Sequence, residues 1–164
     1  MTEIYSKDLL KDQVALVTGA SRGIGAGIAQ SLSSAGAYVI GTATSKSGAK
    51  KIDEDLKDKG TGKVLNVTDA DEVKNIIDEI SFAGNGLHIL VNNAGITRDN
   101  LLMRMKYDEW NDVISANLSG IFNTCKLSLK TMMKQKYGRI INIASVVAHT
   151  GNPGQVNYAA TKSG

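Results

Sequence analysis

The sequence predicts a single α/β domain over residues 1–164, built on a doubly wound parallel sheet. Two patterns carry this prediction. Short apolar runs rich in β-branched residues alternate with helical patterns along the whole chain, which is typical of parallel strands covered by helices on both faces. Glycines at 19, 23 and 25 also form a turn between the first apolar run and the first helical pattern.

Five strands and the helices between them follow in chain order. The first strand is the apolar run 14–17, and a glycine-rich loop precedes the fourth. The fifth strand is nearly all apolar, so we expect it to be central and covered on both faces. The remaining strands are predicted at 39–43, 64–67, 87–91 and 139–145, and the remaining helices at 45–60, from Thr68, from near Asp108 and from Asn157.

The helix that begins near Asp108 carries a polar residue on its apolar side. Asn117 interrupts an otherwise apolar stripe, and a buried amide must find hydrogen-bond partners. The stripe consists of Trp110, Val113, Ile114, Asn117, Leu118, Ile121, Cys125 and Leu129.

Composition excludes several classes of protein. Hydrophobic residues make up 42% of the chain and charged residues 21%, as in globular proteins. The net charge of +3 is small and dispersed, which argues against nucleic-acid binding. Cys125 is the only cysteine. The charged stretch 1–13 lacks the apolar core of a signal peptide, and no apolar run approaches the ~20 residues of a membrane span. We therefore expect a soluble, cytoplasmic protein with no membrane partner.

The glycine turn predicts a phosphate-binding site. Gly19, Gly23 and Gly25 leave the turn without Cβ atoms, and the helix that follows presents backbone N–H groups and its positive dipole end. The spacing differs from G-x-G-x-x-G, because three residues separate the first two glycines. A tight turn that binds nothing is the alternative.

The second strand indicates which dinucleotide would bind. NAD sites of this architecture place Asp or Glu about 20 residues after the glycine turn, to hold the ribose 2′-hydroxyl. Here the end of the strand reads Thr42-Ala43-Thr44-Ser45-Lys46, and no carboxylate occurs before Asp53, while Arg22 projects from the turn. A cation with hydroxyl groups suits a 2′-phosphate, so NADP(H) is predicted. In the alternative interpretation, Arg22 is an ordinary surface residue.

A second group of residues suggests acid–base chemistry. Ser145 follows the fifth strand, and Tyr158 and Lys162 share a helix face at i, i+4. A neighbouring ammonium favours the phenolate form of a tyrosine, which makes proton transfer easier near neutral pH. Ser145 can donate a hydrogen bond to a carbonyl between them. Many surface helices contain Tyr-x-x-x-Lys, so only its combination with the glycine turn is informative.

Together, these motifs resemble the short-chain dehydrogenase/reductase family in order and spacing, over essentially the whole chain. Stretches 95–105, 138–143 and 152–157 further resemble bacterial 3-oxoacyl-[acyl-carrier-protein] reductases. The motifs that carry the family resemblance are 18–25, 92–95, Asn117, Ser145 and 158–162.

The resemblance implies a Rossmann-type fold and specific roles. Tyr158 would donate a proton while NADPH delivers a hydride to the 3-keto carbon, and Ser145 would polarise that carbonyl. Lys162 would hold the nicotinamide ribose, and Asn117 would anchor a water in a proton relay. No metal is implied. The implied cofactor-binding residues are Gly19, Ser21, Arg22, Gly23, Ile24, Gly25, Thr44, Asn66, Val67, Asn93, Ala94, Gly95, Tyr158 and Lys162.

Two features depart from a simple match to the family. His88 stands where the family usually has an acidic residue, and we interpret it as local support for the fourth strand. Lys130, Lys134, Lys136 and Arg139 form a basic helix end, which either meets an acidic carrier protein or is simply solvated.

Length is the largest departure. The resemblance implies seven strands and a homotetramer, so we expect the chain to be incomplete at its C-terminus. The predicted activity is NADPH-dependent reduction of 3-oxoacyl-ACP in fatty-acid synthesis. The alternatives are another short-chain reductase, acting on acetoacetyl-CoA or a polyol, and an inactive dinucleotide-binding fragment.

Overall fold

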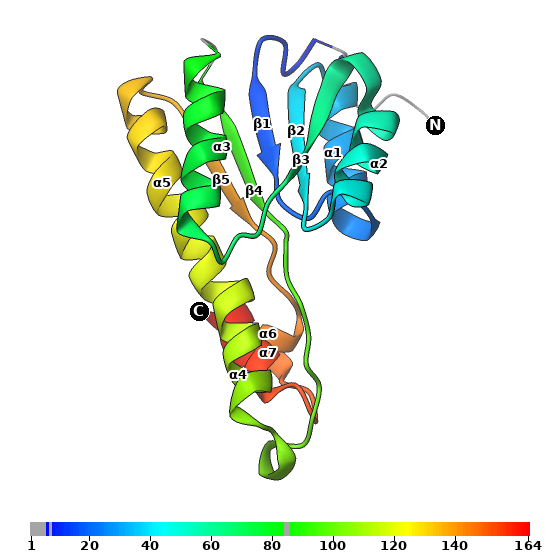
Figure 1. The fold of residues 1–164 in the computed structure, drawn as a ribbon, viewed down its shortest axis with the longest axis vertical. Helices are drawn as coiled ribbons and strands as arrows, with labels where there is room; N and C mark the ends of the chain where they lie inside the picture. The colour runs from blue at the N-terminus through cyan, green and yellow to red at the C-terminus, as the bar shows by residue number, and fades with distance from the viewer. Residues whose placement is uncertain (1–5, 7, 84–85) are drawn as a thin grey trace.

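The computed structural model describes residues 6, 8–83 and 86–164. Residues 84–85 of the predicted glycine-rich loop, and residues 1–5 and 7 of the charged N-terminal stretch, lie outside them. Five parallel strands form one sheet in the order β3-β2-β1-β4-β5 (Figure 1). This is the doubly wound order of Rossmann-type sheets, as predicted. The strands are β1 (Val14–Val17), β2 (Tyr38–Ala43), β3 (Gly60–Val64), β4 (Ile89–Asn92) and β5 (Arg139–Asn142).

Helices cover both faces of the sheet, and further helical segments project beyond its carboxyl edge (Figure 1). Helices α1 and α2 lie on one face, and α3 and α5 lie on the other. The helices are α1 (Gly23–Ser34), α2 (Lys46–Leu56), α3 (Ala70–Phe82), α4 (Tyr107–Ile114), α5 (Gly120–Lys134), α6 (Val147–Thr150) and α7 (Val156–Ser163), with short turns η1 (Lys57–Lys59), η2 (Leu102–Arg104) and η3 (Ser115–Ser119).

The pleat of β1 divides its four residues between two apolar cores. Val14 and Leu16 pack toward α3 and α5, whereas Ala15 and Val17 pack toward α1 and α2. All four are buried, because successive side chains of a strand point to opposite faces and both faces are covered here. The most central strand is therefore the one that the glycine turn follows.

Strand β3 begins earlier than predicted. The apolar run 64–67 was expected to be the strand, but β3 is Gly60–Val64, and Leu65 and Val67 are buried after its end. A Cβ at Gly62 would overlap the carbonyl oxygen of Ala49 in α2. The glycines therefore allow helix and strand backbones to approach closely.

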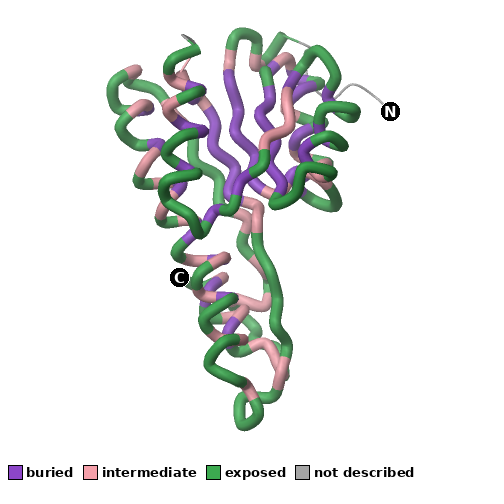
Figure 2. The backbone as a smooth tube through the Cα atoms, in the orientation of Figure 1, coloured by how far each residue is buried: buried purple, intermediate pink, exposed green. Residues whose placement is uncertain are grey.

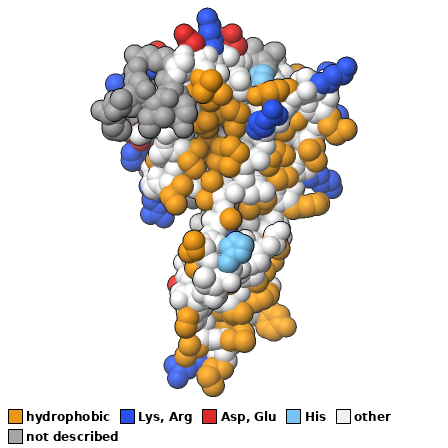
Figure 3. Space-filling model, turned by 180° about the vertical axis from the view of Figure 1, so that it is seen from behind, with side chains coloured by type: hydrophobic (Ala, Val, Ile, Leu, Met, Phe, Trp, Pro, Cys, Tyr) orange, Lys and Arg blue, Asp and Glu red, His pale blue; other side chains and the backbone are white. Residues whose placement is uncertain are grey.

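Strand β5 lies at the edge of the sheet, so the expectation of a central, doubly covered strand is wrong. All four of its residues are exposed, including Ile140 and Ile141. From behind, hydrophobic side chains gather on this part of the surface (Figure 3). The apolar sequence predicted a buried strand, but burial depends on a neighbouring element that the described residues do not supply.

Helix α3 starts two residues later than expected. Its N-cap is Asp69, whose carboxylate accepts the N–H groups of Asp71 and Glu72, whereas Thr68 bonds to the side chain of Asn66. An aspartate at this position satisfies backbone donors that the first helical turn leaves free.

His88 contacts the backbone at the amino end of the sheet. Its Nδ1 accepts the N–H of Val14 at 3.1 Å, and its ring lies 5.8 Å from that of Tyr137. The contact supports the interpretation of His88 as a structural residue that joins β1 to the start of β4.

The predicted long helix from Asp108 is interrupted. It consists of α4, the π-helical turn η3 and α5. Val113 and Asn117 face inward as predicted, but beyond the turn Thr124 and Ser128 are buried and Leu129 is exposed, contrary to the predicted stripe. Most residues of the part projecting below the sheet are not buried (Figure 2).

Candidate active site

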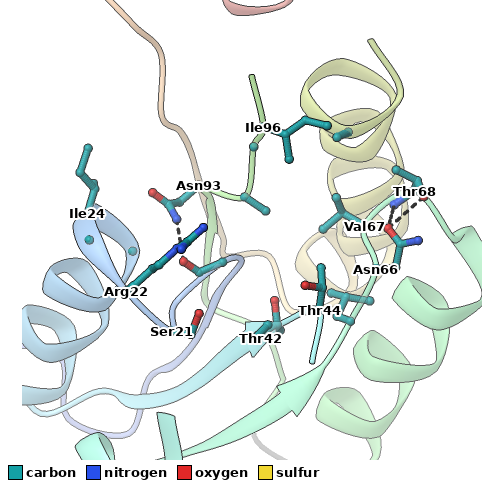
Figure 4. Close-up of a pocket in the computed structure, with 18 of the residues that line it drawn as sticks. Ser21, Arg22, Ile24, Thr42, Thr44, Asn66, Val67, Thr68, Asn93 and Ile96 are labelled. Carbon is teal, nitrogen blue, oxygen red and sulfur yellow. Dashed lines mark hydrogen bonds between the residues drawn. The ribbon is translucent and has the colours of Figure 1, made fainter. Parts of the chain in front are cut away.

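A cleft of about 770 Å³ lies at the carboxyl edge of the sheet (Figure 4). The loops after β1, β2, β3 and β4 form its walls, as expected for ligand sites of parallel sheets. Its volume falls in the range of about 300–1,000 Å³ that is usual for small-molecule sites. It is lined by Gly19, Ser21, Arg22, Gly23, Ile24, Gly25, Thr44, Asn66, Val67, Asn93, Ala94 and Gly95, which are all of the predicted cofactor-binding residues before Tyr158.

The glycine turn is packed too closely for side chains. Gly19 has a φ of +67°, and a Cβ there would lie 3.0 Å from the Cα of Ala94. A Cβ on Gly25 would overlap the carbonyl oxygen of Gly19 and the side-chain amide of Asn93. Only glycine satisfies both constraints, so the first turn of α1 can reach a ligand through its backbone.

Hydrogen bonds join the glycine turn to the end of β4. Thr18 accepts the N–H groups of Asn93 and Ala94 at its Oγ1, both at 3.0 Å. The amide Nδ2 of Asn93 donates to the carbonyl oxygens of Thr18 and Gly19 at 2.9 and 3.0 Å. The side chain of Asn93 therefore holds the cleft wall together.

The charge of the cleft suits an anion near β2. The hydroxyls of Ser21, Thr42 and Thr44 and the guanidinium of Arg22 lie around one end of the cleft (Figure 4). Helix α2 begins beyond Thr44 and has no acidic residue in its first turn. Arginine and hydroxyl donors of this kind fit a phosphate group.

The cleft lining also contains an ion pair. Arg98 Nε lies 3.4 Å from Asp112 Oδ2, and both residues line the cleft. Asn66 lies on the neighbouring loop, where its Oδ1 accepts the N–H and hydroxyl of Thr68.

Tyr158 and Lys162 do not themselves line the cleft, but Lys162 lies close to its wall. Its ammonium donates to the carbonyl oxygen of Ile143 at 2.7 Å and lies 5.9 Å from the centre of the Tyr158 ring. A Cβ built on Gly95, which lines the cleft, would lie 3.8 Å from this ammonium. Partial burial lowers the pKa of Lys162, because desolvation disfavours the charged form.

Asn117 is fully buried and its amide is satisfied. Its Oδ1 accepts the N–H of Ile96 at 2.8 Å, and its Nδ2 donates to the carbonyl of Ile96 at 2.9 Å and to Thr161 Oγ1 at 3.3 Å. The polar residue on the predicted apolar stripe thus binds the backbone next to Gly95.

Ser145 lies three residues beyond β5 on the segment that also carries Ile143. Its Oγ accepts the N–H of Val147 at 3.3 Å, at the start of α6. Among the hydrogen bonds of the described residues, none joins Ser145 to Tyr158 or Lys162. Lys162 approaches this segment through its bond to Ile143.

Several residues that line the cleft were not predicted from the sequence. Arg98 and Asp112 are fourteen positions apart, and only the fold brings them together. Thr42 could have been predicted, because it lies two positions before Thr44 and alternate residues of a strand point to the same face. The lining residues not selected are Thr42, Ala43, Leu65, Thr68, Ile96, Arg98, Asp112, Ser115 and Ala116.

Metal clusters and membrane-spanning helices are both absent from the described residues. Within residues 6, 8–83 and 86–164, we find no group of three or more His, Cys, Asp or Glu side chains able to hold a metal ion. No helix in the same part of the chain combines the length and apolar character needed to cross a bilayer.

Comparison with known proteins identifies close relatives. The chain is 56% identical over 155 residues to the 3-oxoacyl-[acyl-carrier-protein] reductase FabG of Haemophilus influenzae, covering 94% of this chain and 64% of that protein. It is 55% identical over 152 residues to the Escherichia coli protein of the same name, covering 93% and 62%. The Vibrio cholerae protein of that name is 56% identical over 155 residues, covering 94% and 64%.

The chain therefore spans less than two thirds of the length of these relatives. The family comparison covers nearly the whole chain, since residues 13–164 match the short chain dehydrogenase family. The glycine turn, the Asn93 loop and the helix with Tyr158 and Lys162 all lie within the matched residues. The chain belongs to the short-chain dehydrogenase/reductase family.

Proposed function

We propose that the protein catalyses the NADPH-dependent reduction of 3-oxoacyl-ACP to 3-hydroxyacyl-ACP. One observation carries the proposal: Lys162 and Asn117 both lie against Gly95, so the helix bearing Tyr158 adjoins the wall of the dinucleotide-sized cleft. The relatives' printed name, 3-oxoacyl-[acyl-carrier-protein] reductase, supports the choice of substrate.

The charge of the cleft supports NADPH over NADH. Family membership implies a nicotinamide dinucleotide. Arg22, Thr42 and Thr44 would hold the 2′-phosphate, and no carboxylate lies on β2 to repel it. Gly19 and Gly25 leave room for the pyrophosphate beside the N-terminus of α1. When bound, the cofactor supplies the hydride.

The side chains of α7 and its neighbours would complete the reaction. Tyr158 would donate its phenolic proton to the carbonyl oxygen of the substrate, which becomes the hydroxyl of the product. Ser145 would hydrogen-bond the same oxygen. The ammonium of Lys162 would favour the phenolate left on Tyr158 and hold ribose hydroxyls.

The surface offers a place for the acyl carrier protein. Lys130, Lys134, Lys136 and Arg139 are all exposed at the end of α5 and the start of β5. Such a basic group would attract an acidic carrier. We further propose a homotetramer, on family resemblance alone.

The proposal is tested with Tyr158→Phe in the full-length gene product. Removing the proton donor should lower kcat for 3-oxoacyl-ACP reduction by about 10²–10⁴-fold. NADPH affinity, measured by nicotinamide fluorescence, should stay within about twofold. Retained turnover would contradict the role of Tyr158.

Substrate and cofactor are tested on the unaltered enzyme. We expect a higher kcat/KM with 3-oxoacyl-ACP than with the matching CoA thioester, and with NADPH than with NADH. A preference for CoA thioesters or polyols would favour another short-chain reductase, and a preference for NADH would contradict the role of Arg22.

A further inference from the structure

Helix α7 buries a polar face. Its two buried residues are Asn157 and Thr161, which are 0% and 3% exposed. Their i, i+4 spacing places them on one side of the helix, one position before Tyr158 and Lys162. Apolar contacts are non-directional, whereas hydrogen bonds require particular distances and angles. A helix docked by polar groups is therefore fixed more narrowly than one docked by apolar side chains.

Asn157 binds three backbone groups from three parts of the chain. Its Nδ2 donates to the carbonyl oxygens of Arg98 and Glu109 at 3.0 and 3.2 Å, so both amide hydrogens are used. Its Oδ1 accepts the N–H of Tyr158 at 2.8 Å. That N–H belongs to the first turn of α7, where helices lack intrahelical acceptors, and Gln155 provides no side-chain cap.

Thr161 continues the connection on the next turn. Its Oγ1 donates to the carbonyl oxygen of Tyr158 at 2.8 Å and accepts Asn117 Nδ2 at 3.3 Å. Asn117 in turn holds both backbone groups of Ile96, a residue of the cleft wall. The N–H and the C=O of Tyr158 are thus each bonded to a buried polar side chain.

We infer that Asn157 and Thr161 are positioning residues, which fix α7 against the loop 96–98 and α4 and so set where Tyr158 and Lys162 lie relative to the cleft. The inference rests on the proposed function for its catalytic meaning. Neither residue touches the reacting atoms in this role.

The test uses Asn157→Asp and Thr161→Val in the full-length gene product. Asn157→Asp keeps an acceptor for Tyr158 but places oxygen against two carbonyls, and Thr161→Val keeps the shape without the hydroxyl. Each should lower kcat by about tenfold or more, because small displacements of catalytic groups are costly. KM for NADPH should change little, whereas the thermal midpoint should fall in both variants, because each change leaves buried polar groups unpaired.

Two matched variants separate positioning from general damage. Thr161→Ser restores the hydroxyl and should recover most of the lost kcat. Ser163→Ala removes an exposed hydroxyl on the same helix, one that bonds to Ala148, and should leave kcat within about twofold. Unchanged kcat in Asn157→Asp and Thr161→Val would overturn the inference. So would a parallel loss of kcat and NADPH affinity.

An inactive unaltered enzyme would refute the proposed function but not this inference. Hydrogen exchange of residues 156–163 then decides. Faster exchange in Asn157→Asp and Thr161→Val, with β1 and β4 unchanged, supports positioning by these residues. Equal exchange in all variants overturns it.

Discussion

Strands β1 and β4 and helix α7 all lie beside the cleft, but they are fixed in the domain by different interactions. Leu16 of β1 and Leu90 of β4 are fully buried in an apolar core. Helix α7 is fixed by buried amide and hydroxyl groups. The difference teaches that apolar packing fixes the strands beside the cleft, whereas a few directional bonds fix the helix that carries Tyr158 and Lys162.

The largest expected effect comes from disrupting the close packing of the glycine turn beside β1 and β4. Gly25→Ala places a methyl group on the Gly19 carbonyl, so we expect a loss of about 3 kcal/mol of unfolding free energy and of NADPH binding. Gly27→Ala is the matched control on α1, since no described residue has an atom within 4 Å of its Cβ position. It should add about 0.5–1 kcal/mol, because alanine favours helices over glycine. Urea unfolding measures the stability of the two variants, and NADPH fluorescence measures their cofactor binding. Equal stability and equal binding of the two variants would contradict close packing at Gly25.

An intermediate effect tests how much a buried hydrogen bond contributes to stability, using two buried hydroxyls of α5. Thr124 Oγ1 donates to Asn92 Oδ1 at 2.7 Å, whereas Ser128 Oγ has no partner among the residues that the structure describes. Thr124→Val should cost about 1–2 kcal/mol, because it leaves a buried acceptor unpaired, and Ser128→Ala should be neutral or stabilising. Urea unfolding curves of the two variants measure these changes in unfolding free energy. A larger loss of stability in Ser128→Ala than in Thr124→Val would contradict the prediction.

The smallest effect concerns Lys162 and pH. Burial lowers its pKa from 10.5, so between its folded and unfolded pKa values the unfolded chain binds more protons. Stability from this group therefore rises with pH, because the penalty for the buried ammonium is present below the folded pKa and disappears toward 10.5. Relative to Lys162→Met, the unaltered protein should gain stability as the pH rises toward 10.5. Parallel curves would show that Lys162 is not desolvated.

The sequence correctly predicted the elements whose own residue pattern determines which side chains are buried. The residues of β1 alternate between two cores, and its apolar run matches the strand residue for residue. The sequence placed strand β3 too late in the chain. Its glycines do not look like strand residues, and they occur there because the strand packs closely against α2, a contact that no local pattern reveals. The burial of β5 was mispredicted because apolar character does not say which neighbour covers a strand.

The site divides in the same way. The glycine turn and Arg22 are local motifs, and all cofactor residues predicted before Tyr158 line one cleft. The sequence did not indicate a role for Asn157, because its partners, the carbonyls of Arg98 and Glu109, lie in distant segments of the chain. A pair of polar residues at i, i+4 beside Tyr158 and Lys162 was the available signal.

Within the described residues β5 is an edge strand, and this has a consequence for handling the polypeptide. An exposed strand presents unpaired backbone groups, and such a row is a template for pairing with another molecule. Ile140 and Ile141 add apolar surface there, while Arg139 contributes charge that opposes stacking. We therefore expect the solubility of this polypeptide at high concentration to be governed by its outermost strand rather than by its cleft.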